Sequence, residues 1–153
     1  MLRDKILDSD VLVFASPIYF HHLPSTLKAL LDRFRSFANV QVTEKGLVHT
    51  PYREWHKEFV LILSQGSPDP SDARPVIDLF RYICRIMGPA NNLHVVTATG
   101  LAMVNQVIKT ERELAEQYRK MKLHEKLVAK DVRKNRELLD QCRELGRTLS
   151  LPG

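Results

Sequence analysis

The chain has 153 residues, of which 44% are hydrophobic and 27% are charged, and its formal net charge is +5 at pH 7. This length and composition are typical of one soluble globular domain that buries a proper core. No apolar run approaches the roughly 20 residues needed to cross a bilayer, and the first residues lack the apolar stretch of a signal peptide. We therefore expect a single domain spanning residues 1–153, located in the cytoplasm and without a membrane partner.

The excess positive charge is concentrated in the last third of the chain. Between residues 99 and 148, Lys and Arg recur densely but alternate with Glu and Asp, often three or four positions apart. Such spacing is typical of an ion-paired, solvated helix face. No aromatic ladder or base-reading motif accompanies the charge, so we expect no nucleic-acid partner. Cys84 and Cys142 are isolated and lack metal-ligand spacing, which predicts two free thiols in a reducing compartment and no metal site.

The first half of the chain predicts one buried strand between two helices. Residues 1–8 read as the last turns of a helix, and the continuous apolar run Val11–Ala15 is typical of a strand buried on both faces. A second helix is expected over residues 24–37, because it opens on a proline that suits the first helical turn. Residues 39–52, which are interrupted by glycine and proline, are expected to form an irregular connection.

The second half adds two more buried strands, the apolar runs Glu58–Ser64 and Leu93–Ala98. Between them, the apolar positions of residues 73–87 recur at helical spacing and end at a glycine followed by a proline. Residues 103–149 form a helical tract whose apolar stripe changes phase, so two helices fit better than one. The first of these, at about 103–122, is an extension of the domain and a candidate oligomer contact. Alternating strands and helices predict an α/β fold with a parallel sheet.

One segment near the amino terminus carries a more specific pattern. Asp10, the apolar run after it and the S-P-I-Y-F of residues 16–20 lead into a helix that carries Lys28, Asp32 and Arg33. This order resembles NAD(P)H-dependent FMN reductases, most nearly the iron–sulfur flavoproteins and multimeric flavodoxin-like quinone reductases. The resemblance implies a flavodoxin-like, three-layer parallel sheet and hydride transfer from NAD(P)H to FMN, then to a quinone, flavin or similar small-molecule acceptor. Lys28 and Asp32 also stand four residues apart, which predicts an intrahelical ion pair.

Two turns at the carboxyl ends of the predicted strands are the candidate cofactor site. Ligands of open α/β sheets bind at this edge, and in the resembling family the S-P-x-Y-F turn holds the isoalloxazine ring of FMN. By position, the cofactor-binding residues are Ser16, Pro17, Ile18, Tyr19 and Phe20 in the first turn and Ser64, Gln65, Gly66 and Ser67 in the second. The alternative for each is a plain strand-ending turn whose side chains complete the core. No side chain needs to act as an acid or base, so we name no catalytic residue.

The chain departs from the resembling family ahead of Val11–Ala15. Flavodoxin-like sheets have the strand order 2-1-3-4-5, and by resemblance the three predicted strands correspond to strands 3, 4 and 5. We therefore expect a fold truncated to its C-terminal three strands, without the FMN phosphate loop and without the cysteine cluster of iron–sulfur flavoproteins. An interior-type strand at an open sheet edge favours a homo-oligomer. A non-catalytic subunit that acts by assembly with a partner is the alternative function.

Overall fold

The structure is a computed structural model that describes residues 2–149. These residues form two compact units, which we call the sheet unit (residues 2–99) and the helical unit (residues 100–149). The sheet unit contains both turns of the candidate cofactor site. Its elements in chain order are α1 (Leu2–Asp8), β1 (Val11–Pro17), α2 (Ser25–Asp32), η1 (Arg33–Phe37), β2 (Ala38–Thr43), β3 (Gly46–Pro51), β4 (Glu58–Ser64), η2 (Pro70–Ala73), α3 (Arg74–Met87) and β5 (Asn92–Ala98).

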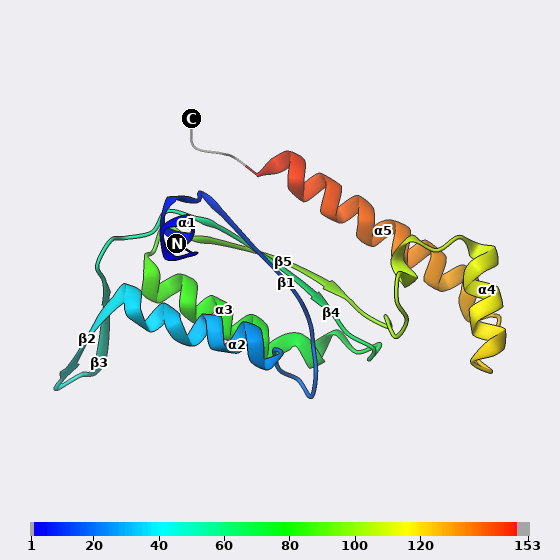
Figure 1. The fold of residues 1–153 in the computed structure, drawn as a ribbon, viewed down its shortest axis with the longest axis horizontal. Coiled ribbons are helices and arrows are strands. Elements are labelled where there is room, and N and C mark those ends of the chain that lie inside the picture. Colours follow the sequence, from blue (N-terminus) through cyan, green and yellow to red (C-terminus); the bar gives the residue numbers. More distant parts are fainter. Residues whose placement is uncertain (1, 150–153) are drawn as a thin grey trace. The chain divides into compact units, whose positions relative to one another are not determined.

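Three parallel strands form the centre of the sheet unit, in the order β1-β4-β5 (Figure 1). This confirms the predicted parallel sheet and the order of its strands. The register pairs Pro17 with Ser64 and Ser64 with Ala98, so the last residues of the three strands lie together at one edge. We call this edge, where the strands end, the carboxyl end of the sheet, and the opposite edge the amino end.

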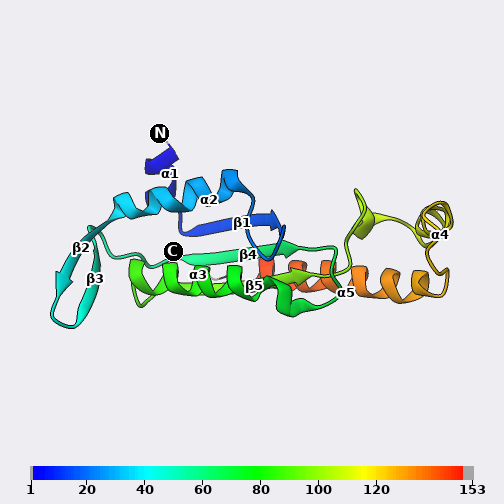
Figure 2. The same ribbon diagram turned by 90° about the horizontal axis from the view of Figure 1, so that it is seen from below.

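Helices α2 and α3 lie on the same side of the three strands (Figures 1 and 2). The core between them and the sheet is largely aromatic. Phe14 of β1 lies at its centre, with ring centroids 4.9 Å from Phe80 of α3, 6.1 Å from Phe59 of β4 and 6.3 Å from Phe34 of η1. All four side chains are buried. Burial of apolar surface on this scale supplies most of the driving force for folding.

Residues 39–52 were expected to be irregular, and this prediction is wrong. Strands β2 and β3 pair antiparallel from Ala38 opposite Pro51 to Thr43 opposite Gly46, and together they form a two-stranded ribbon. The glycine that suggested a break is the residue that closes the ribbon, since its φ of 111° suits a tight turn. The predicted helix over residues 24–37 also differs, because its last part, Arg33–Phe37, is a 3₁₀ helix.

The helical unit consists of η3 (Gln106–Ile108), α4 (Glu111–Lys120) and α5 (Leu127–Thr148). The expected division of this tract into two helices is confirmed, but the first helix begins eight residues later than Met103. Asn105 has a left-handed φ of 58° that interrupts the helix. Thr110 then starts α4 through a capping box with Glu113, whose pKa is lowered by hydrogen bonds from the Thr110 backbone and side chain.

A small core holds α4 and α5 together, formed by Leu114, Tyr118 and Val128. The Tyr118 hydroxyl donates a hydrogen bond to Asp131 of α5, which in turn accepts one from Lys134 at 3.0 Å. Burial, together with the neighbouring carboxylate, raises the pKa of Tyr118 well above its usual range. The hydroxyl therefore stays protonated at neutral pH and acts as a structural donor.

Candidate functional site

The first loop of the candidate site follows β1 and forms a miniature hairpin. The backbone N–H of Tyr19 donates to the carbonyl of His22, and the N–H of His22 donates back to Tyr19, both at 2.9 Å. The two residues between them, Phe20 and His21, have positive φ angles of 49° and 61°. Two central residues with positive φ are the signature of a type I′ turn, which Asn and Gly normally occupy. An aromatic residue in this conformation is strained, and such strain concentrates at functional sites.

The side chains of this loop divide into buried and exposed groups. Ser16 and Ile18 are buried, and the Ser16 hydroxyl donates to the carbonyl of Pro17 at 3.0 Å, so neither side chain is free to contact a ligand. Tyr19 is 62% exposed and Phe20 is 101% exposed. The loop therefore presents two aromatic rings to its surroundings, while the residues before them anchor it in the core.

The second loop follows β4, and its first residue is buried. The Gln65 side chain donates from Nε2 to the carbonyls of Ser67 and Asp69, so it folds the loop back on itself. Its Oε1 is buried and accepts no hydrogen bond from any described residue. Beyond it, a Cβ built on Gly66 would meet nothing within 4 Å, which leaves the backbone there open to close approach.

Hydrogen bonds between backbones hold the two loops side by side. The N–H of Ile18 donates to the carbonyl of Ser64 at 2.8 Å, and the N–H of Gln65 donates to the carbonyl of Ala98 at 2.9 Å. The structure thus brings both predicted groups, Ser16–Phe20 and Ser64–Ser67, to the carboxyl end of the sheet. Their role in binding a cofactor stays a prediction.

Several backbone donors in these loops have no partner. The N–H groups of Phe20, His21, Gly66 and Ser67 donate to no described residue. A flat heteroaromatic ring with carbonyl and imine acceptors along one edge matches such donors, and the exposed rings of Tyr19 and Phe20 can pack on its faces. The residues present therefore fit the ring of a flavin.

One contact between the loops was not expected from the sequence. His21 Nδ1 lies 3.6 Å from Asp72 Oδ1, which links the tip of the first loop to η2 beyond the second. The two residues are far apart in the chain, and no local pattern signals their pairing. Exposed pairs of this kind contribute little to stability, so the link orients the loop more than it stabilises it.

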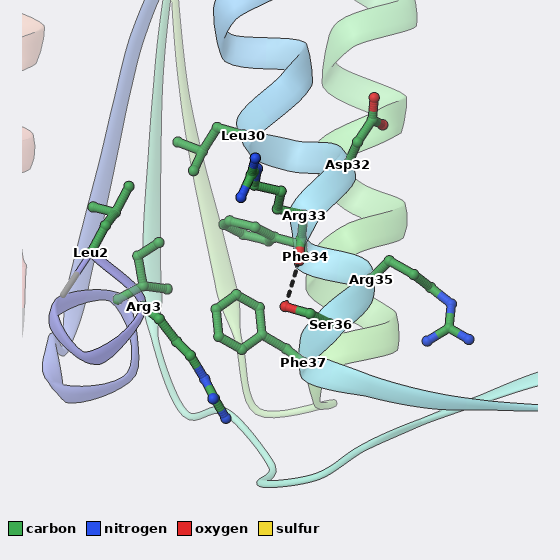
Figure 3. Close-up of a pocket in the computed structure, with 10 residues that line it drawn as sticks. Leu2, Arg3, Leu30, Asp32, Arg33, Phe34, Arg35, Ser36 and Phe37 are labelled. Carbon is green, nitrogen blue, oxygen red and sulfur yellow. Dashed lines mark hydrogen bonds between the residues drawn. The ribbon is translucent and has the colours of Figure 1, made fainter.

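A cavity of about 590 Å³ lies at the amino end of the sheet, away from both loops. It lies between α1 and the α2–η1 segment, and Figure 3 shows the rings of Phe34 and Phe37 pointing toward α1. Arg3 extends from α1, and Arg33 from the other side. A smaller apolar groove of about 290 Å³ continues along the free edge of β1. Neither cavity was expected from the sequence.

Cys84 and Cys142 are free cysteines, as expected, and burial raises the pKa of the Cys84 thiol to about 12, so it stays protonated and unreactive. Within residues 2–149, no three His, Cys, Asp or Glu side chains gather in a way that could hold a metal ion. No helix in the same range has the length and apolar composition needed to cross a membrane.

The fold defines an α/β protein whose candidate ligand site, the two loops, lies at the carboxyl end of a parallel sheet. More specifically, the chain belongs to the NADPH-dependent FMN reductase family, whose model matches residues 1–104. The match covers the whole sheet unit, including both loops. FMN and NAD(P)H are the cofactor and co-substrate that this family implies. No curated protein matches the chain.

Solved structures show the same fold. The chain is similar to the azoreductase from Bacillus anthracis str. Sterne and to the azoreductase AzrA, in each case with 16% sequence identity and a TM-score of 0.56. Each similarity covers 93% of this chain but only 58% of the azoreductase chain. At this level of identity the likeness shows the fold alone, which is flavodoxin-like.

Proposed function

We propose that the protein is an FMN-dependent NAD(P)H oxidoreductase that passes electrons to a small-molecule acceptor such as a quinone or a flavin. The observation that carries this proposal is the pair of loops at the carboxyl end of the sheet. In these loops the backbone N–H groups of Phe20 and Gly66 donate to no described residue, and the ring of Tyr19 is exposed. Family membership supports FMN as the group that these donors would hold.

Bound FMN would accept hydride from NAD(P)H and pass electrons to the acceptor. The part of this chain is to bind and orient the ring. The N–H groups of Phe20 and His21 on one side, and of Gly66 and Ser67 on the other, would donate to its polar edge. Tyr19 and Phe20 would cover a ring face and exclude water from it. No side chain in either loop is needed to move a proton, so none is assigned as catalytic.

Binding of the phosphate group of FMN is a separate question from binding of its ring. Each charge-assisted hydrogen bond to a phosphate contributes about 1.5–3 kcal/mol. A comparison of FMN with riboflavin, which lacks the phosphate, therefore measures how much phosphate contacts add to the affinity of this chain.

Titration of the purified chain with FMN and with riboflavin, followed by flavin fluorescence, tests the proposal. We expect both flavins to bind, since the proposed contacts are made to the ring that the two flavins share. NADPH should then bleach the visible absorbance of the bound flavin. Tight binding of FMN alone would show that a phosphate site exists, and no binding of either flavin would overturn the proposed function.

The second candidate function is a non-catalytic subunit that acts by assembly. It is favoured by strand β1, which lies at one edge of the sheet and pairs with β4 alone among the described strands. Interior-type strands at a free edge invite pairing with another chain. Purified protein that forms a stable complex but neither carries nor binds flavin would favour this function over the first.

Free thiols such as Cys84 support the expected cytoplasmic location.

A further inference from the structure

The basic residues of the helical unit divide into a paired and an unpaired group. Farther along α5, Arg133, Arg143 and Arg147 each pair with a glutamate or aspartate three or four residues away, as the sequence predicted. Where α4 connects to α5, at the change from yellow to orange in Figure 1, the side chains of four lysines form no ion pair or hydrogen bond with any residue in the range 2–149. These are Lys120, Lys122, Lys126 and Lys130, and we call residues 120–130 the basic tip.

The acidic side chains in and beside the basic tip are already engaged. Glu125, the one carboxylate of the tip, lies 3.1 Å from the guanidinium of Arg119, measured from Oε1 to Nε. Asp131, the next residue after the tip, accepts hydrogen bonds from Tyr118 and Lys134. All four lysines of the tip are exposed. The tip therefore presents four positive charges that no acidic side chain of its own offsets.

Large aliphatic side chains are exposed among these lysines. Met121 is 49% exposed, Leu123 is 42% exposed and Leu127 is 41% exposed, although the small core of Leu114, Tyr118 and Val128 lies in the same unit. Single exposed apolar residues are normal on a protein surface, whereas several close together mark interaction sites. The basic tip thus combines unpaired positive charge with exposed aliphatic surface.

The backbone of the basic tip holds a lysine where glycine is normally found. Helix α4 ends in a Schellman motif, in which the N–H of Leu123 donates to the carbonyl of Tyr118 at 2.8 Å and the N–H of Lys122 donates to that of Arg119 at 3.2 Å. Lys122 has the left-handed φ of 56° that this motif requires. A side chain in this conformation costs stability, and such strain is typical of functional positions.

The composition of the basic tip favours a lipid surface over a nucleic acid or an acidic protein. Arginine is the more common residue for reading bases, and lysine is depleted in protein interfaces. Residues 120–130 contain no Phe, Tyr or Trp on which a base could stack. Flexible lysines beside exposed aliphatic side chains match a surface that has diffuse negative charge above an apolar layer.

We propose that the basic tip binds the surface of a membrane that contains anionic lipids. The ammonium groups of the four lysines contact the charged headgroups, and Met121, Leu123 and Leu127 enter the boundary between the headgroups and the acyl chains. Each lysine near such a surface strengthens binding about fivefold. Lys122 extends from the turn itself, so its charge offsets the cost of its strained backbone when the membrane is bound.

Binding of this kind needs no membrane-spanning segment. The sequence predicted no membrane partner because the chain lacks an apolar run of spanning length, and a segment that lies on the surface does not need one. The contact uses only residues of the helical unit, so it does not depend on flavin binding to the sheet unit.

Sedimentation of the full chain with lipid vesicles tests the proposal. Vesicles of phosphatidylcholine with about 30% phosphatidylserine should bind the chain at about 0.1 M salt, where the Debye length is about 10 Å. Vesicles of phosphatidylcholine alone should bind it at least about 100-fold more weakly. At about 1 M salt, where the Debye length falls to about 3 Å, most of the binding should be lost.

Charge variants test the position of the contact. K122Q/K126Q should weaken binding to the anionic vesicles about 25-fold. The matched control is K5Q/K45Q, which removes the same charge from two exposed lysines of the sheet unit that form no described ion pair. It should change binding by less than about twofold, because position and not net charge decides the contact.

Aliphatic variants test the apolar part of the contact. L123S/L127S should weaken binding about tenfold and make the remaining binding more sensitive to salt. V42S is the control, because Val42 is an 85% exposed valine of the sheet unit, and it should leave binding unchanged. Circular dichroism shows whether each variant is folded.

Lys122→Gly separates a membrane role from a structural one. Glycine adopts the positive φ without strain, so the thermal unfolding midpoint should rise by about 2–4 °C. Binding to the anionic vesicles should nevertheless weaken about fivefold.

Three outcomes would overturn the proposal. The first is a wild-type chain that does not bind the anionic vesicles at low salt. The second is binding that K122Q/K126Q and K5Q/K45Q weaken equally, which would show attraction by net charge alone. The third is a duplex DNA of arbitrary sequence that binds more tightly than the vesicles and depends on the same lysines, which would make the tip a nucleic-acid surface.

Discussion

The two ends of the central sheet differ in whether their aromatic side chains are exposed or buried. At the carboxyl end, the loops after β1 and β4 expose aromatic rings and leave backbone donors without partners. At the amino end, the aromatic side chains are buried against one another, with Trp55 5.7 Å from Phe34 and 6.1 Å from Phe59. The same strands therefore carry stability at one end and the capacity to bind a ligand at the other.

The amino end also contains the most deeply buried charge of the sheet unit. Lys57 donates from Nζ to the carbonyl of Leu7 at 2.9 Å and to that of Ser9, and it lies 5.5 Å from the ring centroid of Trp55. Burial lowers its pKa, an effect that the nearby Asp10 partly offsets. The lysine ties the end of α1 to the start of β4. At the carboxyl end, the tip of the exposed turn is linked to η2 by the exposed pair His21–Asp72 instead.

The largest expected loss of stability follows from shortening one aromatic side chain of the cluster at the amino end. Phe34→Ala should lower the free energy of unfolding by about 3–5 kcal/mol, because it leaves a cavity among Phe14, Phe37 and Trp55. Urea denaturation measures this loss. Flavin affinity of the folded fraction should stay the same. If flavin binding fell while stability did not, the division of roles between the two ends would be wrong.

Removal of the buried lysine should have the next largest effect. Lys57→Met leaves the carbonyls of Leu7 and Ser9 without this donor, which should cost about 1–3 kcal/mol. The matched control is Lys45→Met in the exposed turn of the ribbon, which should change stability by less than about 0.5 kcal/mol. Hydrogen exchange should show that α1 opens more often in the first variant. Equal effects of the two substitutions would contradict an anchoring role.

A substitution in the strained turn should not lower the free energy of unfolding, unlike the two substitutions at the amino end. Phe20→Gly relieves an unfavourable φ and removes no buried contact, so stability should be unchanged or higher by up to about 1 kcal/mol. Flavin affinity should fall about tenfold, because a stacking ring is lost. Thermal unfolding and flavin titration on the same samples measure both quantities. A clear loss of stability would show that the ring has a structural role that its exposure hides.

The smallest expected effect concerns acid stability at the amino end. The Glu58 carboxyl accepts hydrogen bonds from Asn92 at 2.7 Å and from His94. Burial by itself would raise the pKa of Glu58, but these bonds outweigh it and the pKa is lowered. A carboxyl with a lowered pKa stabilises the fold above its unfolded value of 4.5 and loses that contribution as the pH falls. Glu58→Gln should therefore reduce stability at neutral pH by less than about 1 kcal/mol, with a smaller difference below pH ~4.

The carboxyl-end loops show how far local sequence signals reach. The positions of both loops followed from the ends of the apolar runs Val11–Ala15 and Glu58–Ser64, and the structure places them together. The conformation within them did not follow. Phe20 adopts a positive φ although it is not a residue that favours it, because the hydrogen-bond pair between Tyr19 and His22 closes a type I′ turn around it. The burial of the Gln65 side chain, which donates to carbonyls of its own loop, was not signalled by the sequence either.

The amino end was harder to anticipate. The ribbon has only three apolar residues on β2 and two on β3, and its glycine and proline read as breakers when the partner strand is unknown. Whether the two strands pair depends on both segments together, so neither segment alone predicts the ribbon. The cavity between α1 and η1 depends on side chains that lie more than 25 positions apart in the chain.

The sequence by itself determined the parallel strands, their order, helix α3 and the division of the last tract into α4 and α5. These features follow from apolar periodicity and end signals, which act over a few residues and reflect how much of each segment is buried. Only the tertiary structure decided the strained turn, the ribbon, the buried Lys57 and the amino-end cavity. The lysine and the cavity depend on contacts between distant segments, and the turn and the ribbon depend on hydrogen bonds between residues whose own local preferences are weak or unfavourable.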